Sequence, residues 1–413
     1  MEQKINRYIK IYPWYSGFVG DLLFYIAIDT LFLTLVKQFS PSEIVSIASL
    51  SQLACIALQF PILFIIKKIG NTASTWVGAL LLLLSAIFIT FGKSYYLVLL
   101  GRVLHDASII FKAASTVALE NNLDAVGRRN EFVRVRTASN TAYSVITMLI
   151  SFVASWLFNL NHYLPMYCCI ATCTIGFILS LFLKDYTDYN KIQPQKGEKA
   201  RAKIHYSKII LLIIVIYGIF YPIVSHSQNE GKLFIQEHLL LDFDEDATSL
   251  IIGAILCASR IIRVFSNLIF GKLYEKYQSK MGIALPAVLA MAIGLLLGGS
   301  FIGHTLAKIL VMSVGYTILL FVRDPFKLYI QDVLFMKTPK EQHQTLLTIL
   351  EFGVKVASAG IGLAFSAILV SYPLLLVVGI MLAIALVEVV LSIILYRAIL
   401  LGNNQPEPLA THA

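Results

Sequence analysis

The sequence predicts an all-α membrane protein with twelve transmembrane helices arranged as two pseudo-symmetric six-helix bundles. Of the 413 residues, 58% are hydrophobic and only 14% are charged, whereas soluble proteins carry roughly a quarter charged residues. The apolar residues gather in runs of about 20 or more, the length that crosses about 30 Å of hydrocarbon. A polar, basic segment near the middle of the chain separates six such runs from six others.

Each apolar run is expected to form one membrane-spanning helix. Two runs follow a helix-start signal, in which Ser40 precedes Pro41 and Thr338 precedes Pro339. The expected helices cover residues 11–36, 44–66, 73–92, 95–119, 137–158, 163–183, 209–236, 247–270, 281–301, 306–334, 344–370 and 373–400.

The runs predict four segments along the chain. Residues 1–183 form the first bundle and 209–400 the second, 184–208 form a basic cytoplasmic linker, and 401–413 form a disordered cytoplasmic tail. Lysine and arginine concentrate in alternate loops, while the opposite loops hold little beyond Lys37, Lys93 and Lys232. This bias predicts a multi-pass protein of the cell membrane, plasma or inner, with both termini in the cytoplasm.

Several function classes are excluded. The net charge of +9 comes from loops between spans, not from a surface that follows phosphates, so no nucleic-acid partner is expected. The five cysteines lie inside apolar runs and predict neither disulfides nor a metal site. No phosphate-binding loop and no hydrolase or metalloprotease motif occurs, so the sequence predicts neither a cofactor nor an enzyme.

Many ionisable or amide side chains fall inside the apolar runs, where a charge costs at least roughly 2.5–3.5 kcal/mol on insertion scales. Such residues are candidates for substrate binding or ion coupling. They are Asp21, Asp29, Arg102, His105, Asp106, Gln228, Asn229, Arg260, Arg323, Asp324, Lys327, Glu351 and Lys355. Among the carboxylates, Asp106 and Asp21 are the first candidates for proton coupling, followed by Asp324 and Glu351.

Some of these charges have a purely structural alternative. Arg102 with Asp106, Asp324 with Lys327, and Glu351 with Lys355 are spaced to neutralise each other on one helix. Lys112 and Arg263 have the spacing to extend toward the membrane surface. Arg134 and Arg136 are interpreted as cytoplasmic anchors.

Three motifs resemble those of the major facilitator superfamily. The pattern Gly-x-x-x-Asp-Arg-x-Gly-Arg/Lys, which follows helices 2 and 8 there, is partly kept by Gly271, Glu275 and Lys276, and by Lys68 and Gly70, although Lys67 replaces the acid. The run Gly101-Arg102-Val103-Leu104-His105-Asp106 is similar to the helix-4 motif Gly-Arg-x-x-x-Gly, with Asp106 at the second glycine. The resemblance implies that Gly271, Glu275, Lys276, Lys68 and Gly70 take part in gating.

The resemblance further implies a secondary transporter that works by alternating access, with its site between the two halves. The excess of buried cations favours an anionic or zwitterionic small organic solute, and protons are the expected coupling ion, with sodium as the alternative. One rival function is proton-coupled multidrug efflux, and a rival of another class is a transporter-like membrane sensor or partner subunit. A monomer in the lipid bilayer is expected.

Overall fold

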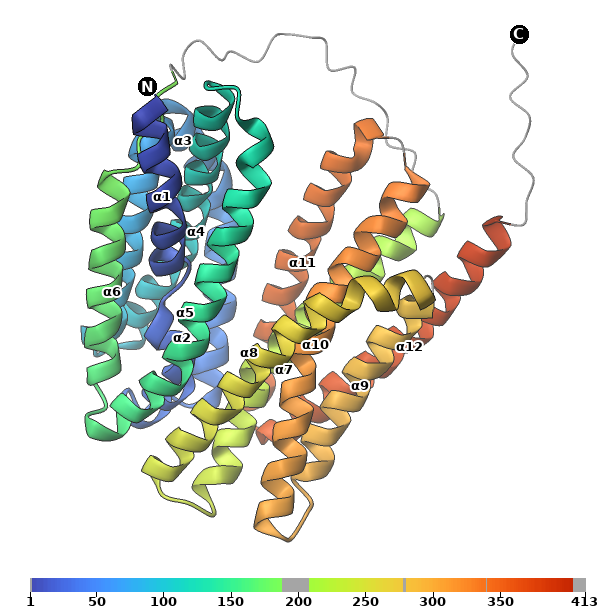
Figure 1. Ribbon diagram of the computed structural model, residues 1–413. Helices are drawn as coiled ribbons and strands as arrows, with labels where there is room; N and C mark the ends of the chain where they lie inside the picture. Colours follow the sequence, from blue (N-terminus) through green and yellow to red (C-terminus); the bar gives the residue numbers. More distant parts are fainter. Residues whose placement is uncertain (1, 188–207, 278–279, 339, 404–413) are drawn as a thin grey trace. The chain divides into compact units, whose positions relative to one another are not determined.

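The computed structural model describes residues 2–187, 208–277, 280–338 and 340–403. Within them every regular element is a helix, and no strand occurs (Figure 1). Most of the predicted linker and residues 404–413 of the predicted tail lie outside the described residues. The contacts divide the chain into two compact units, and each is described by itself.

Unit 1 consists of residues 1–199 with 236–260 and 362–371. Helix α3 packs along α4, and α1 packs against α5 and α6. The elements of this unit are α1 (Glu2–Val19), α2 (Leu23–Leu31), η1 (Phe32–Val36), α3 (Pro41–Phe91), α4 (Tyr95–Asp124), η2 (Arg129–Glu131), α5 (Phe132–Leu160) and α6 (Leu164–Leu181).

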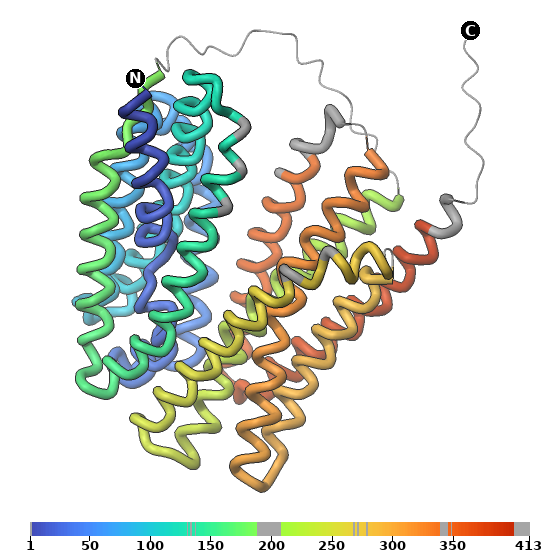
Figure 2. The backbone as a smooth tube through the Cα atoms, viewed as in Figure 1, coloured from blue at the N-terminus to red at the C-terminus, as the bar shows by residue number. Residues whose placement is uncertain are grey.

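Unit 2 consists of residues 200–235, 261–361 and 372–413. Helix α9 packs between α10 and α12, as the yellow-orange to red part of the tube in Figure 2 shows. The helices that lie wholly or partly in this unit are α7 (Lys208–Leu240), α8 (Glu245–Tyr277), α9 (Met281–Gly299), α10 (Thr305–Lys337), α11 (Lys340–Leu369) and α12 (Leu374–Asn403). Residues 236–240 of α7, 245–260 of α8 and 362–369 of α11 belong to unit 1.

The first predicted span, 11–36, is not one helix. It consists of α1, a break at residues 20–22, α2 and the π-helix η1. The Asp21 carboxylate accepts a hydrogen bond from the Leu22 amide at 2.8 Å, which satisfies a donor at the start of α2. At Gly20 a β-carbon would lie 2.4 Å from the Tyr143 ring, so only glycine permits this close approach. The break therefore depends on polar caps and close packing that an apolar run does not reveal.

The second and third predicted spans are two helices that meet at Gly70, and both lie within the element labelled α3. Gly70 has φ +80° and ψ +170°, a conformation that side chains with a β-carbon avoid. The start of α3 agrees with the sequence signal, because Ser40 and Glu43 form a reciprocal capping box before Pro41. The two predicted spans are thus separate helices, and their junction at Gly70 falls within the predicted gap between residues 66 and 73.

Ten helices in the described part of the chain are long and apolar enough to cross a membrane. One of them is α3, which covers two predicted spans, and α4, the predicted span that carries Arg102, Asp106 and Lys112, is not among them. Lys232 differs from its prediction as a loop residue: it lies inside α7 and is buried. This position agrees with the expected span 209–236, which already includes Lys232.

Candidate functional site

A histidine between two carboxylates forms a buried polar cluster in unit 1. His105 of α4 is 4% exposed. Its Nε2 lies 2.6 Å from Oδ1 of Asp21 at the helix break, and its Nδ1 lies 3.1 Å from Oδ1 of Asp106. The sequence singled out all three residues, and the structure brings them together.

The contacts of His105 require one more proton than a neutral imidazole and two ionised carboxylates hold together. A neutral imidazole donates from one ring nitrogen only, and carboxylates only accept. Since both ring nitrogens of His105 face carboxylate oxygens, either the imidazole carries a second proton or one carboxyl is protonated. This is the chemistry of a proton-binding site.

Lys112 joins the same helix break from the next turns of α4. Its ammonium donates to the carbonyl oxygen of Val19 at 2.5 Å and to that of Gly20 at 3.3 Å. The carbonyl end of a helix carries partial negative charge, so a cation there is stabilising. Lys112 is therefore bound to the backbone of α1, in contrast to the alternative in which it extends toward the membrane surface.

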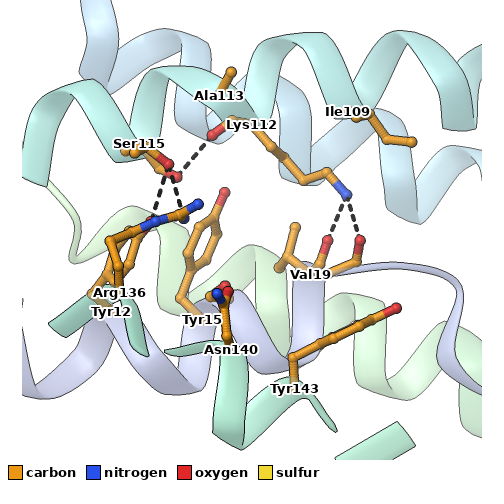
Figure 3. A pocket seen from close by; sticks show the side chains of 13 residues that line it. Tyr12, Tyr15, Val19, Ile109, Lys112, Ala113, Ser115, Arg136, Asn140 and Tyr143 are labelled. Carbon is orange, nitrogen blue, oxygen red and sulfur yellow. Dashed lines mark hydrogen bonds between the residues drawn. The ribbon is translucent and has the colours of Figure 1, made fainter. Parts of the chain in front are cut away.

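A cavity of about 380 Å³ opens between α1, α4 and α5 (Figure 3). Lys112 and Arg136 are the only charged side chains among its 13 lining residues, and the aromatic part of the wall comes from Tyr12, Tyr15 and Tyr143. No acidic residue is among those lining residues. A wall of this composition suits an anion with an apolar body.

Arg136 lies at the opposite end of this cavity from the ammonium of Lys112 (Figure 3). One terminal guanidinium nitrogen donates to the hydroxyl of Tyr12 at 2.9 Å and to that of Thr116 at 3.2 Å. Both partners are neutral, so the positive charge is not compensated there. Its prediction as a cytoplasmic anchor missed this position because a count of spans does not show which way a side chain points.

In unit 2 the charged candidates form pairs between helices. Arg263 of α8 binds Asp324 of α10 through two contacts of 2.7 and 3.2 Å. Lys327 of α10 lies 3.1 Å from Glu351 of α11. The sequence spacing had favoured Lys327 as the partner of Asp324 and Lys355 as the partner of Glu351. In the structure both carboxylates bind a cation on another helix. Arg323 lies over the ring of Tyr221, with 5.8 Å from the guanidinium carbon to the ring centroid.

A second buried histidine, in unit 2, also has both ring nitrogens facing oxygen atoms. His226 Nδ1 lies 2.9 Å from Oε1 of Glu230, and its Nε2 lies 2.9 Å from the carbonyl oxygen of Ser358 on α11. Glu230 was missed by the sequence analysis, although its spacing of four residues from His226 on one helix is a usable signal. Each unit thus contains a buried histidine paired with carboxylate.

A sequence model of the Major Facilitator Superfamily matches residues 14–322, well over half of the chain. The chain belongs to the major facilitator superfamily. It is therefore a multi-pass membrane transporter and not an enzyme, and it takes a small-molecule substrate within a lipid bilayer.

Solved structures that resemble this superfamily member include a variant of the nucleoside transporter NupG, with a TM-score of 0.71 and 11% identity over 96% of this chain and 99% of that one. Another is a bacterial homologue of the iron transporter ferroportin, with a TM-score of 0.67 and 13% identity over 96% and 99%. A search of curated proteins by sequence matched none. Identities this low show the fold and leave the cargo open.

The residues that the loop motif suggests for gating are not among the contacts of the His105 and His226 clusters in the described residues. Lys68 is exposed just before the kink at Gly70 in α3. Gly271, Glu275 and Lys276 lie within α8 and not in a loop after it, and the side chains of Glu275 and Lys276 are exposed. Their part in gating stays a prediction.

The other predicted site residues occupy varied surroundings. Asp29 accepts from the Thr30 amide at 2.7 Å, and Arg102, which forms no salt bridge with Asp106 in the described residues, is half-buried on α4. Gln228, Arg260 and Lys355 are half-buried, and Asn229 is exposed. Of these residues, Arg102 lies close enough to the His105 cluster for its charge to act on Asp106 and Asp21.

Asp185, shortly after α6, is a connecting residue that the sequence analysis missed. Its Oδ2 accepts from the side-chain amides of Asn71 at 2.7 Å and Asn121 at 3.0 Å, and its backbone amide donates to Thr72 at 2.8 Å. It thus places an acid close to Gly70, which belongs to a loop motif where this chain has Lys67 at the position of the usual acid. Only the fold brings these segments together, so no local motif could have indicated it.

Proposed function

We propose that the chain is a secondary active transporter that moves a small organic anion or zwitterion by alternating access and couples this movement to protons. The observation that carries the proposal is the cavity wall, on which Lys112 and Arg136 are the only charges. A site that binds anions needs uncompensated cations held in a partly dry pocket, where their attraction for a carboxylate is stronger than in water.

Proton coupling is supported by the neighbouring His105 cluster. Lys112 binds the carbonyl oxygens of Val19 and Gly20, and the next residue is Asp21, which contacts His105. An anion that draws the ammonium toward the cavity removes positive charge from beside Asp21, which favours protonation of the cluster. Substrate binding and proton binding are thereby linked through one backbone segment.

The multidrug-efflux alternative receives no support from this cavity. A pocket for lipophilic cations would place one or two acids in an aromatic wall, and this wall has none among its lining residues. The proposal retains the orientation derived from the loops, with both termini in the cytoplasm, and a monomer in the cell membrane whose bundles 1–183 and 209–400 rock about the substrate.

The test uses purified protein in liposomes that contain the pH-sensitive dye pyranine. A panel of carboxylates, amino acids and tetraphenylphosphonium is added outside, with sodium absent. We expect carboxylates or zwitterions to move protons with the wild type, and Asp21→Asn and His105→Gln to abolish this while uptake driven by the solute gradient remains. Asp124→Asn, at the exposed end of the same helix α4, is the control and should behave like the wild type.

Two outcomes would overturn the proposal. Proton movement with tetraphenylphosphonium alone would replace it by cation efflux. Uptake of an anion that follows a sodium gradient and ignores the pH gradient would remove the proton coupling.

A further inference from the structure

The cavity of unit 1 has one cation at each end. We propose that it binds an organic dianion whose two acidic groups lie about 4–6 Å apart, one group contacting Arg136 and the other contacting Lys112. This inference rests on the proposed function and narrows its substrate class.

The Arg136 end has unused binding capacity. A guanidinium has five N–H donors, and the two contacts found for Arg136 both come from the same terminal nitrogen and go to hydroxyl groups. Within the described residues Arg136 forms no salt bridge with a carboxylate. An acidic group of a ligand would therefore be its first anionic partner.

The Lys112 end of the cavity also has a donor that an acidic group of a ligand could use. The ammonium donates to main-chain carbonyl oxygens at 2.5 and 3.3 Å. The charge of Asp21 acts on it from nearby, but the two groups form no salt bridge in the described part of the chain. An ammonium has three donors, so it can turn one of them to a carboxylate in the cavity. Because a charge-assisted bond to an anion is stronger than one to a neutral carbonyl, a ligand carboxylate competes well for this group.

The spacing of the two cations follows from the helix that holds both. Arg136 donates to the side-chain hydroxyl of Tyr12, and Lys112 donates to the main-chain carbonyl oxygen of Val19. Tyr12 and Val19 are seven residues apart on α1, so the rise between them gives the approximate spacing of the cations. At 1.5 Å of rise per residue their separation along the helix is about 10 Å. With each carboxyl carbon about 3 Å from the cation that its oxygens contact, about 4–6 Å is left between the two carboxyl carbons of the ligand.

The wall between the cations favours an apolar body for this dianion. Tyr15 and Tyr143 line the cavity, and Figure 3 shows the ring of Tyr15 between the two charged groups. The buried hydroxyl of Tyr15 has no hydrogen-bond partner of good geometry within the described residues, so it is available to a polar group of the ligand. The volume of about 380 Å³ is at the small end of the range of ligand pockets.

A series of straight-chain dicarboxylates measures the spacing directly. An extended chain advances about 1.2 Å per bond, because three bonds of extended backbone cover about 3.3–3.6 Å. A gap of about 4–6 Å between carboxyl carbons therefore corresponds to about two to four methylene groups. Succinate, glutarate and adipate meet this condition, while malonate is too short and sebacate too long.

The experiment measures the thermal shift of purified wild-type protein in detergent with dicarboxylates from malonate to sebacate, and with butyrate and hexanoate. We expect the largest shift for the succinate–adipate group and almost none for the monocarboxylates. Arg136→Gln and Lys112→Met should each weaken binding of the best dianion at least about tenfold. Arg134→Gln, at an exposed position of the same helix α5, and Lys93→Met are the matched controls and should bind like the wild type.

The wild-type series is decisive even if a variant fails to fold. Equal shifts with monocarboxylates, or shifts that rise steadily with chain length, would overturn the dianion while leaving an anion transporter in place. If no carboxylate or zwitterion shifts the wild type and only tetraphenylphosphonium does, the dianion and the proposed function both fall.

Discussion

The ammonium of Lys112 lies 2.5 Å from the main-chain carbonyl oxygen of Val19, the last residue of α1. The two residues belong to different helices and are 93 positions apart in the chain. This bond holds the end of α1 at the point where the first membrane span is interrupted. Asp21, two residues after Val19, contacts His105.

Replacing Lys112 by methionine keeps an unbranched side chain that is one atom shorter, and it removes the bond to the break. Hydrogen bonds to charged groups contribute about 1.5–3 kcal/mol, so Lys112→Met should lower the free energy of unfolding by about that amount. Amide hydrogen exchange should become faster at residues 17–22 and stay unchanged in α6. Lys93→Met is the control, with an effect near zero. Unchanged exchange at the break would contradict the role of Lys112.

Gly70→Ala tests the kink of α3. A residue with a β-carbon is strained at φ +80°, at a cost of about 1–3 kcal/mol, and we expect the melting temperature to fall accordingly. Gly379→Ala in α12 is the matched control, since its β-carbon would meet no atom within 4 Å and alanine is the better helix former by up to about 1 kcal/mol. Equal effects of the two substitutions would show that Gly70 is not held in this conformation.

The sequence predicts the helices of this fold well, and also the interruption at Gly70, but it misses the break inside the first span. Long apolar runs locate the spans because lipid requires them, and the capping box at Ser40 fixes the start of α3. The break at Asp21 lies inside an apolar run, and it involves contacts with other segments, such as those of Gly20 with Tyr143 and of Val19 with Lys112. Local pattern contains no information about such contacts.

The same limit applies to the charged residues. Inserting a charge in a membrane is costly, so the sequence indicates that His105, Asp21 and Asp324 matter. The spacing within one helix favoured Lys327 as the partner of Asp324, whereas the structure pairs Asp324 with Arg263 on another helix. Only local neighbours are visible in a sequence, so partners on other helices could not be predicted.

A double-mutant cycle measures the pair that the fold selects. Arg263 and Asp324 share two contacts and are 38% and 25% exposed, whereas Lys327 and Glu351 share one contact and are 36% and 60% exposed. We expect a coupling free energy of about 1–2 kcal/mol for the first pair and of about 0–0.5 kcal/mol for the second. The measurement is thermal unfolding of the single and double alanine variants in detergent. The reverse order would show that exposure does not decide the strength of these pairs.

The His226–Glu230 pair gives a test of the buried proton in unit 2. In Glu230→Gln a side-chain amide can donate to Nδ1 while Nε2 still donates to Ser358, so both contacts survive with a neutral imidazole. We expect this variant to unfold within about 1 kcal/mol of the wild type and Glu230→Ala to lose about 2–4 kcal/mol, because the alanine variant leaves a buried ring nitrogen without its partner. Equal losses in the two variants would contradict this account of the proton.

The contacts of Asp185 have a mechanical consequence. This residue fastens the chain that leaves α6 to Asn71 on α3 and to Asn121 on α4, and Asn71 directly follows the kink at Gly70. Tension that enters unit 1 through the chain after Thr187 is therefore delivered to the joint between two membrane spans and to the end of a third. Main-chain bonds of Lys184 and Tyr186 to Asn122 on α4 add to this attachment, so the load is shared between α3 and α4.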